Sequence, residues 1–189
     1  MASQRAYYTK EIATFLTDDP AAVLGQLACG QAGDLTPAQR NAWVQQIELL
    51  HAALPGLPDG MILFEYLIPR MGKRVDNILL VGHTVLVIEF KVGATSYDRS
   101  AINQAIDYAL DLKNFHAGSR STTIVPILAA SKAPTELRQP VVAPDDVADV
   151  MRANARLCRK TSFRCHPEVS LNECHADHAG KVLCGFLEA

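Results

Sequence analysis

The apolar residues between positions 37 and 54 recur every three or four residues, which is the spacing of one buried helix face. They are Trp43, Ile47, Leu50 and Leu54. Thr36-Pro37, a capping residue followed by a first-turn proline, marks the start of this helix. The segment Pro55 to Gly60 is rich in proline and glycine and predicts the turn that ends it.

A shorter helix is predicted upstream, from Ala21 to Cys29. Its start signal is Thr17-Asp18-Asp19-Pro20, and Gly30 is expected to stop it. The preceding segment, Tyr7 to Leu16, fits either a short helix or a strand, and the sequence leaves both open.

The pattern then changes to short segments rich in β-branched and aliphatic residues, which is typical of strands. Three strands are predicted, Met61 to Ile68, Arg74 to Val81 and Thr84 to Lys91. Gly72-Lys73 and Gly82-His83 lie between them as hairpin connections. We therefore expect an antiparallel meander.

Ser100 to Phe115 has the apolar stripe of an amphipathic helix, and Thr122 to Ala130 is expected to form a buried strand. Pro126 within that strand predicts a bulge or an edge position. Ala143 to Asp146 introduces a further predicted helix, Val147 to Arg156. The order α-β-β-β-α-β predicts one α/β domain over 1–189, a mixed β-sheet flanked by helices, with its core at 60–130.

The composition, 49% hydrophobic and 20% charged, is typical of a globular α/β protein. No apolar run has the length of a membrane span, and Met1 to Lys10 lacks the apolar segment of a secretory signal, so we expect a cytoplasmic protein with no membrane association. The net charge of −2 argues against a tight, non-specific DNA binder. It does not exclude a nuclease, because an acidic metal site itself lowers the net charge.

The five cysteines argue against a disulfide framework, since an odd count in an apparently cytosolic chain is typical of free thiols. Most of them lie in the tail, which lacks clear periodicity and is expected to form an irregular appendage over 157–189. The tail contains Cys158, Cys165, His166, Cys174, His175, His178 and Cys184. Without CxxC or HxxxH pairs, this spacing favours free thiols over a zinc site.

The third predicted strand contains two candidate catalytic residues, Glu89 and Lys91. They are two residues apart and therefore share a face of the strand. Both interrupt an apolar strand, and buried charges need partners. If Gly82 turns the second strand onto the third, Asp76 approaches Glu89 across the sheet. Two close carboxylates favour a cation between them, and Mg²⁺ or Mn²⁺ with oxygen ligands is the simplest candidate. Lys91 would then stabilise developing charge or orient the attacking water.

The series Asp76…Glu89-Phe90-Lys91 resembles the D…(D/E)xK core of the PD-(D/E)xK nuclease superfamily. Gln104 and Tyr108 match the QxxxY motif of its RecB-like branch. The resemblance implies a restriction-endonuclease-like core in which Asp76 and Glu89 bind the metal, Lys91 is catalytic, and Gln104 and Tyr108 support the site or touch the substrate. Val75 stands where the proline that names the motif would be.

The stretches FEYLIPRMGKRVDNILL, VLVIEFKVG and INQAIDYALDLKNFH look similar to a nuclease-like domain found ahead of a P-loop helicase in some bacterial proteins. In the superfamily the position of Glu65 often carries an additional acidic residue, so Glu65 is a further candidate catalytic and metal-binding residue. The chain itself contains no GxxxxGK(S/T) sequence, so no helicase function is predicted for it. The resemblance makes a helicase or another protein a candidate partner.

Each of these residues also has a structural interpretation, and for Glu89 and Lys91 it is a surface ion pair on an edge strand. Asp76 could pair with Lys73 or Arg74 rather than with a metal, and Glu65 could simply be a residue of a half-exposed strand. Lys73 and Arg74, with Arg70, could contact a substrate phosphate or form an ordinary solvated turn. Gln104 and Tyr108 lie one helical turn apart, and the structural alternative for them is a surface pair with Tyr108 in the core.

The sequence therefore predicts a Mg²⁺-dependent phosphodiester hydrolase that acts on nucleic acid, with DNA favoured over RNA. The first alternative is a nucleic-acid or protein binding module that retains the nuclease fold without turnover. A third hypothesis is a dimerising structural protein, a homodimer encoded by a mobile element.

Overall fold

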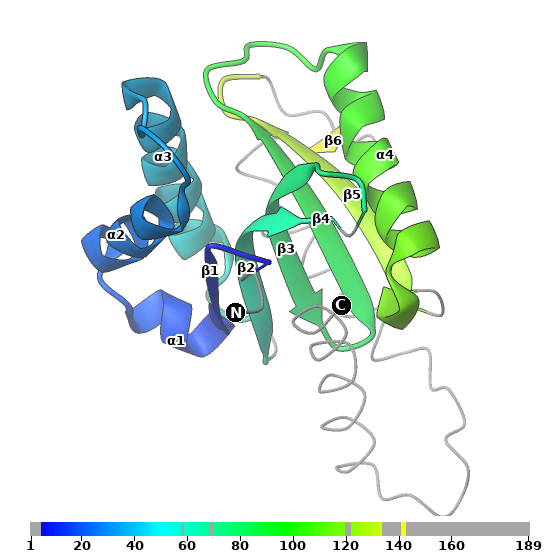
Figure 1. The fold of residues 1–189 in the computed structure, drawn as a ribbon, viewed down its shortest axis with the longest axis horizontal. Helices are drawn as coiled ribbons and strands as arrows, with labels where there is room; N and C mark the ends of the chain where they lie inside the picture. The colour runs from blue at the N-terminus through cyan, green and yellow to red at the C-terminus, as the bar shows by residue number, and fades with distance from the viewer. Residues whose placement is uncertain (1–4, 58, 69, 120–121, 134–140, 143–189) are drawn as a thin grey trace, which may run out of the picture.

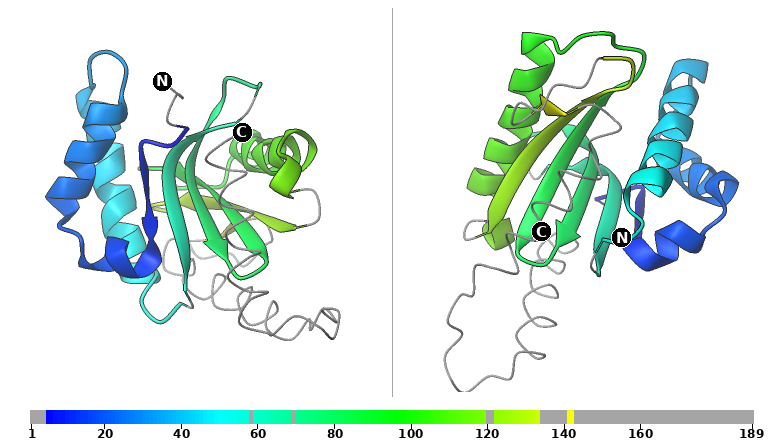
Figure 2. Two further views of the ribbon diagram at one scale, coloured as in Figure 1. Left: turned by 60° about the horizontal axis from the view of Figure 1, so that its bottom comes forward. Right: turned by 180° about the vertical axis from the view of Figure 1, so that it is seen from behind.

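The computed structural model describes residues 5–57, 59–68, 70–119, 122–133 and 141–142. Its centre is a six-stranded sheet in which the strands are neighbours in the order in which they follow one another along the chain, β1-β2-β3-β4-β5-β6 (Figure 1). The three N-terminal helices lie on one side of this sheet, and the long helix α4 lies on the other (Figures 1 and 2). The predicted class, an α/β fold with a mixed sheet flanked by helices, is confirmed.

The N-terminal segment resolves the ambiguity between strand and helix by forming both. Strand β1 (Tyr8–Glu11) pairs antiparallel with β2, and helix α1 (Ile12–Thr17) follows it directly. Helices α2 (Pro20–Gly30) and α3 (Pro37–Ala53) come next, and each has a proline in its first turn. The side chains of Asp19 and Thr36 cap them by accepting hydrogen bonds from backbone N–H groups, as the sequence signals predict.

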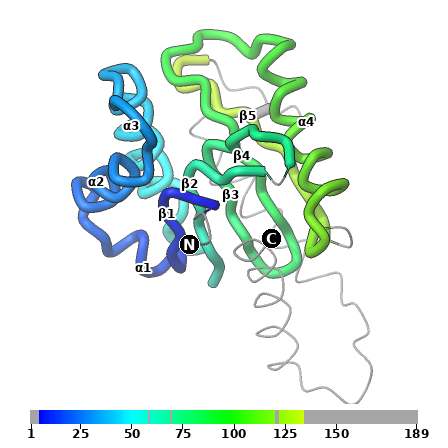
Figure 3. The backbone as a smooth tube through the Cα atoms, viewed as in Figure 1, coloured from blue at the N-terminus to red at the C-terminus, as the bar shows by residue number. Residues whose placement is uncertain are grey.

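The predicted meander is confirmed. Strands β2 (Gly60–Leu67), β3 (Arg74–Val81) and β4 (Thr84–Lys91) pair antiparallel in sequence order. Helix α4 (Arg99–Phe115) and the short 3-10 helix η1 (Ala117–Ser119) then return the chain, so that β5 (Thr123–Ala130) runs parallel to β4. The crossover helix therefore covers the strand that carries Glu89 and Lys91 (Figure 3).

The sheet has more strands than the sequence predicts, because β1 and the two-residue β6 (Val141–Val142) add to it at opposite edges. Pro126 pairs with Val87 on the β4 side, whereas the described pairing of β5 with β6 involves only Leu128 and Ala129. Within the described residues, Pro126 thus lies at an edge, one of the two positions predicted for it. The predicted helix Val147–Arg156 and the tail 157–189 lie outside the described residues.

The core consists of two main apolar clusters, one on each face of the sheet. Alternate strand residues face the N-terminal helices, where Phe15, Trp43 and Leu50 are fully buried. The residues between them face α4, where Val87 packs with Leu112. In the part of the chain that the structure describes, no helix is long and apolar enough to cross a membrane.

Candidate metal and active site

Three acidic residues occupy one row across neighbouring strands. Phe64 pairs with Asn77 and Tyr66 with Val75, so Glu65 stands opposite Asp76. The β3–β4 pairing ends at Asn77 and Ile88, and one step further along the same register Asp76 stands opposite Glu89. The backbone N–H of Phe90 donates to Oδ2 of Asp76 at 2.7 Å, which ties this carboxylate to β4. The sequence expectation that Asp76 approaches Glu89 across the hairpin agrees with this register.

The β2–β3 hairpin changes direction at this row. Before it, Phe64 packs in the cluster under the N-terminal helices, but after it Tyr66 and Val75 pack in the cluster on the α4 side. Strict alternation would keep Phe64 and Tyr66 on one face. Glu65 has a φ of 53°, in the left-handed region, and this conformation produces the change. The acidic row therefore lies where the hairpin bends toward α4.

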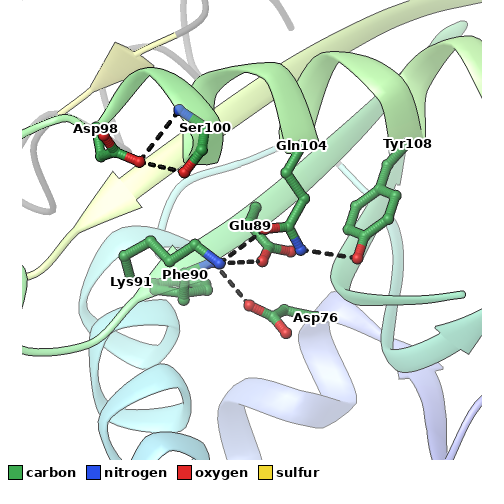
Figure 4. A network of polar contacts seen from close by, with 8 residues as sticks. All are labelled: Asp76, Glu89, Phe90, Lys91, Asp98, Ser100, Gln104 and Tyr108. Atoms are coloured by element: carbon green, nitrogen blue, oxygen red, sulfur yellow. Dashed lines mark hydrogen bonds and ion pairs between the residues drawn. The ribbon is translucent and has the colours of Figure 1, made fainter.

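Glu89 and Lys91 share a face, as predicted, and Lys91 links β4 to α4. The Nζ atom of Lys91 lies 2.9 Å from Oε1 of Glu89 and 2.9 Å from Oε1 of Gln104. Nε2 of Gln104 in turn donates to the hydroxyl of Tyr108 at 2.8 Å (Figure 4). Gln104 and Tyr108 therefore form a hydrogen-bonded unit that holds the lysine, and four of the residues quoted for the family resemblance, Glu89, Lys91, Gln104 and Tyr108, form one network.

Glu89 is only 4% exposed, and its second carboxylate oxygen has an unusual environment. Oε1 accepts from Lys91, but Oε2 is buried without a hydrogen-bond partner among the described residues. An unpartnered buried carboxylate oxygen is costly, because nothing replaces the water that it lost. This oxygen marks a place where a ligand would be stabilising.

The pKa values of the site residues also favour a bound cation. Burial raises the pKa of Asp76 well above its ordinary value, and the charge of Glu89 raises it further, against the opposing hydrogen bond from Phe90. Burial also raises the pKa of Glu89, which the ion pair with Lys91 opposes. For Lys91, burial works to lower the pKa, but the hydrogen bond and charge of Glu89 prevail and raise it. A protonated Lys91 beside two carboxylates leaves an excess of negative charge that a cation would neutralise.

The donor set fits a small hard cation. Mg²⁺ is commonly held by one or two carboxylates and keeps several waters, so Asp76 and the unpartnered Oε2 of Glu89 are suitable ligands. Within the described residues, no group of three or more His, Cys, Asp or Glu side chains is arranged to enclose a metal ion. Asp76 and Glu89 would leave the other coordination positions of such a cation to water.

Glu65, the third candidate ligand, is turned toward α3. Its Oε1 accepts from Nε1 of Trp43 at 2.8 Å and from Nε2 of Gln39 at 3.2 Å, and the residue is 8% exposed. Burial raises the pKa of Glu65, and the hydrogen bond from Trp43 opposes this rise. Neither partner could be predicted from the sequence, because Trp43 fits the apolar stripe of its helix and Gln39 is an ordinary polar residue.

The two basic candidates have partners within the fold. The guanidinium of Arg74 lies 4.2 Å from the ring centroid of Tyr7 and donates to the backbone carbonyls of Arg5 and Glu65. Lys73 forms an exposed ion pair with Asp111 at 3.1 Å. None of these contacts links Lys73 or Arg74 to Asp76 or Glu89. A phosphate-binding role for Lys73 and Arg74 stays a prediction.

Comparison with known proteins adds little. No protein-family model matches the chain, and no curated protein matches it. A solved structure, that of protein VC1899 from Vibrio cholerae, is similar over 74% of this chain and 42% of its own, with 10% identity and a TM-score of 0.30. The chain thus spans less than half the length of that protein, and a similarity this low carries no argument about function.

Proposed function

We propose that this chain is a divalent-cation-dependent phosphodiester hydrolase, a nuclease that acts on nucleic acid and preferentially on DNA. The observation that carries the proposal is the environment of Glu89. Its Oε2 is buried without a partner, Asp76 stands opposite it, and Lys91 is fixed beside it. This arrangement, together with Gln104 and Tyr108, supports membership of the PD-(D/E)xK superfamily and its RecB-like branch.

Asp76 and Glu89 would hold Mg²⁺ or Mn²⁺, which when bound lowers the pKa of a coordinated water and neutralises phosphate charge. Lys91 places an ammonium next to the carboxylates, where it can orient the attacking water and stabilise negative charge on the phosphate. Gln104 restricts Lys91 by accepting a hydrogen bond from it, and Tyr108 restricts Gln104. An ammonium group held in place stabilises the transition state more than a mobile one, since it needs no reorganisation during the reaction.

The test is cleavage of plasmid and single-stranded DNA in the presence of Mg²⁺. Wild type should cleave, and Glu89→Ala and Lys91→Ala should each lose at least about a hundredfold in rate, the typical contribution of one such group. Lys10→Ala is the matched control for Lys91→Ala, because Lys10 is an exposed residue of β1, and it should cleave as wild type does. Equal rates for all variants would remove the catalytic assignment.

A second candidate function is a binding module that retains the fold without turnover, which the net charge of −2 favours over a nuclease with its own strong DNA affinity. On this alternative, a partner such as a helicase supplies the DNA affinity. Calorimetry with Mg²⁺ and Mn²⁺ distinguishes the two, because an intact site binds the cation and a degenerate one does not. A cytoplasmic location is part of both proposals.

A homodimer is the third candidate, and it needs an apolar contact surface. Among the described residues, the large apolar side chains that are exposed are Leu110 at 52% and Phe115 at 46%, both on α4. Leu110 and Phe115 are five positions apart on α4 and therefore face different directions, so these two residues give a homodimer less support than the candidate site gives the cation-dependent hydrolase.

A further inference from the structure

Glu65 has a combination of features that a purely structural residue does not need. It belongs to the acidic row opposite Asp76, it adopts a left-handed φ, and its carboxylate accepts two hydrogen bonds from α3. A buried carboxylate is a costly partner for an indole N–H, because the neutral amide of a glutamine would accept the same hydrogen bond without the cost of burying a charge. The hydrogen bond to Trp43 therefore does not explain why this position carries a negative charge.

The charge of Glu65 acts on the candidate site. It contributes to the raised pKa of Asp76 and to that of Glu89. Because Glu65 also stands opposite Asp76 in the β2–β3 register, its charge would act on a cation bound by Asp76 and Glu89. Asp76 and Glu89 are the acids proposed to bind the cation, and Glu65 is the third acid of the same row.

Both hydrogen bonds from α3 use the same oxygen of Glu65. Nε1 of Trp43 and Nε2 of Gln39 donate to Oε1, which leaves Oε2 outside these bonds. The two donors lie on one face of α3, one turn apart, and the helix is anchored in the core by Ile47 and Leu50. A rigid helix that grips one carboxylate oxygen sets the direction in which the other one points.

We propose that Trp43 and Gln39 are positioning residues of the cation site. By holding Oε1 of Glu65 they direct its Oε2 toward the cation that Asp76 and Glu89 bind. Glu65 thereby becomes a partner of that cation through a coordinated water. The inference rests on the proposed cation site and adds to it a coupling between that site and the N-terminal helices.

The first test measures Mn²⁺ affinity by calorimetry on the full chain. Trp43→Phe removes the indole N–H but keeps an aromatic ring, and Gln39→Ala removes the other donor from a partly exposed helix position that alanine suits. Each should weaken Mn²⁺ binding on the order of tenfold, as the loss of an outer partner of a metal ligand typically does. Ile47→Val is the control, since Ile47 is buried on the same helix and no described hydrogen bond links it to Glu65. It should bind Mn²⁺ as wild type does.

The outcomes separate the two proposals. If wild type binds no Mn²⁺, both the cation site and the positioning role are wrong. If wild type binds Mn²⁺ and both Trp43→Phe and Gln39→Ala bind it equally well, only the positioning role is wrong. If Ile47→Val weakens binding as much as they do, the effect is a general loss of packing, and the positioning role is again wrong.

The second test uses the fluorescence of Trp43, which is the single tryptophan of the chain. Because its N–H is bonded to Glu65, a Mg²⁺ titration should shift its emission with the midpoint that calorimetry gives. Glu89→Gln should abolish the shift by removing a ligand, although Trp43 and Glu65 are unchanged. Cation binding without any change in emission would overturn the coupling, because a residue with a merely structural role would not respond.

Discussion

Asp76 and Glu89 stand opposite one another in the register of the β3–β4 hairpin, and only Glu89 has an ion pair with the neighbouring Lys91. The carboxylate of Asp76 instead accepts a backbone hydrogen bond from Phe90. Without a bound cation, the two acids repel one another in a poorly solvated place. The candidate site is therefore a local source of instability in the fold.

The first prediction follows from this repulsion. Asp76→Asn keeps an oxygen that can accept the Phe90 hydrogen bond but removes the charge, so without divalent cations it should raise the free energy of unfolding by about 1 kcal/mol. For a chain of this size, that corresponds to an increase in Tm of about 2–4 °C. Mg²⁺ should stabilise wild type through binding, but not Asp76→Asn. Thermal melts with EDTA and with Mg²⁺ measure both effects.

Asp107→Asn is the control for this comparison, because Asp107 is an exposed residue of α4 and its replacement should change stability by less than about 0.5 kcal/mol. A destabilised Asp76→Asn in EDTA would contradict the prediction. It would show that the charge of Asp76 has a favourable partner in the folded protein.

The second prediction concerns Gln104, which contacts Lys91 rather than the carboxylates. Gln104→Leu should leave Mn²⁺ affinity close to that of wild type but lower the cleavage rate roughly tenfold, because Lys91 loses one of its two hydrogen-bond partners and its position becomes less well defined. Asn103→Leu, at the neighbouring exposed position of the helix, is the matched control. Parallel calorimetry and DNA cleavage give both quantities. A large loss of Mn²⁺ affinity in Gln104→Leu would show that Gln104 serves the cation instead.

Much of the fold follows from local sequence patterns. The three strands of the meander and helix α4 are predicted to within a residue or two, because alternating and helical patterns are strong in these segments and the turns contain glycine. Strand β1 falls in the segment Tyr7 to Leu16, for which the sequence left strand and helix open, and β6 is not predicted, since each is too short to have a period of its own. Both are stabilised by pairing with a longer neighbouring strand.

Some contacts of the candidate site could likewise be predicted from the sequence, and others could not. The pairs Glu89–Lys91 and Gln104–Tyr108 could be predicted to share a face, because their members are two and four residues apart within regular elements. That the second pair lies against the first was expected only from the family resemblance, because Lys91 and Gln104 belong to different elements. The partners of Arg74 could not be, because Arg5 and Tyr7 are distant in the sequence. Long-range contacts of this kind depend on how strands assemble, which the local pattern does not encode.

The bend at Glu65 provides the third prediction. A left-handed φ is costly for a β-branched side chain such as valine, because the second substituent on Cβ approaches the backbone. Glu65→Val and Glu65→Leu both lose the hydrogen bonds from Trp43 and Gln39, so the difference between them isolates the backbone effect. We expect Glu65→Val to be less stable than Glu65→Leu by about 1 kcal/mol, measured by urea unfolding. Equal stability would mean that the hairpin can straighten at this position.

The fourth prediction is a dependence of stability on pH that arises away from the candidate site, at His51. Its ring centroid lies 4.4 Å from that of Phe15, and its Nε2 is buried without a hydrogen-bond partner among the described residues. Burial lowers the pKa of His51 below its ordinary value of 6.5, and the charge of Asp18 opposes this only in part. The folded protein therefore prefers the neutral ring, and the unfolded chain binds the proton more readily.

A lowered histidine pKa gives stability that is fully present above the unfolded value and is lost as the pH falls below it. Urea unfolding at about pH 8 and about pH 5 should therefore show a lower midpoint at the acidic pH for wild type. His51→Gln removes the titrating group while keeping a polar side chain, so the drop between the two conditions should be smaller in that variant. Because acidic residues elsewhere contribute to the pH dependence of both proteins, the difference between their two drops is the quantity that reports on His51. An equal drop in both would show that the ring accepts its proton in the folded state as easily as in water.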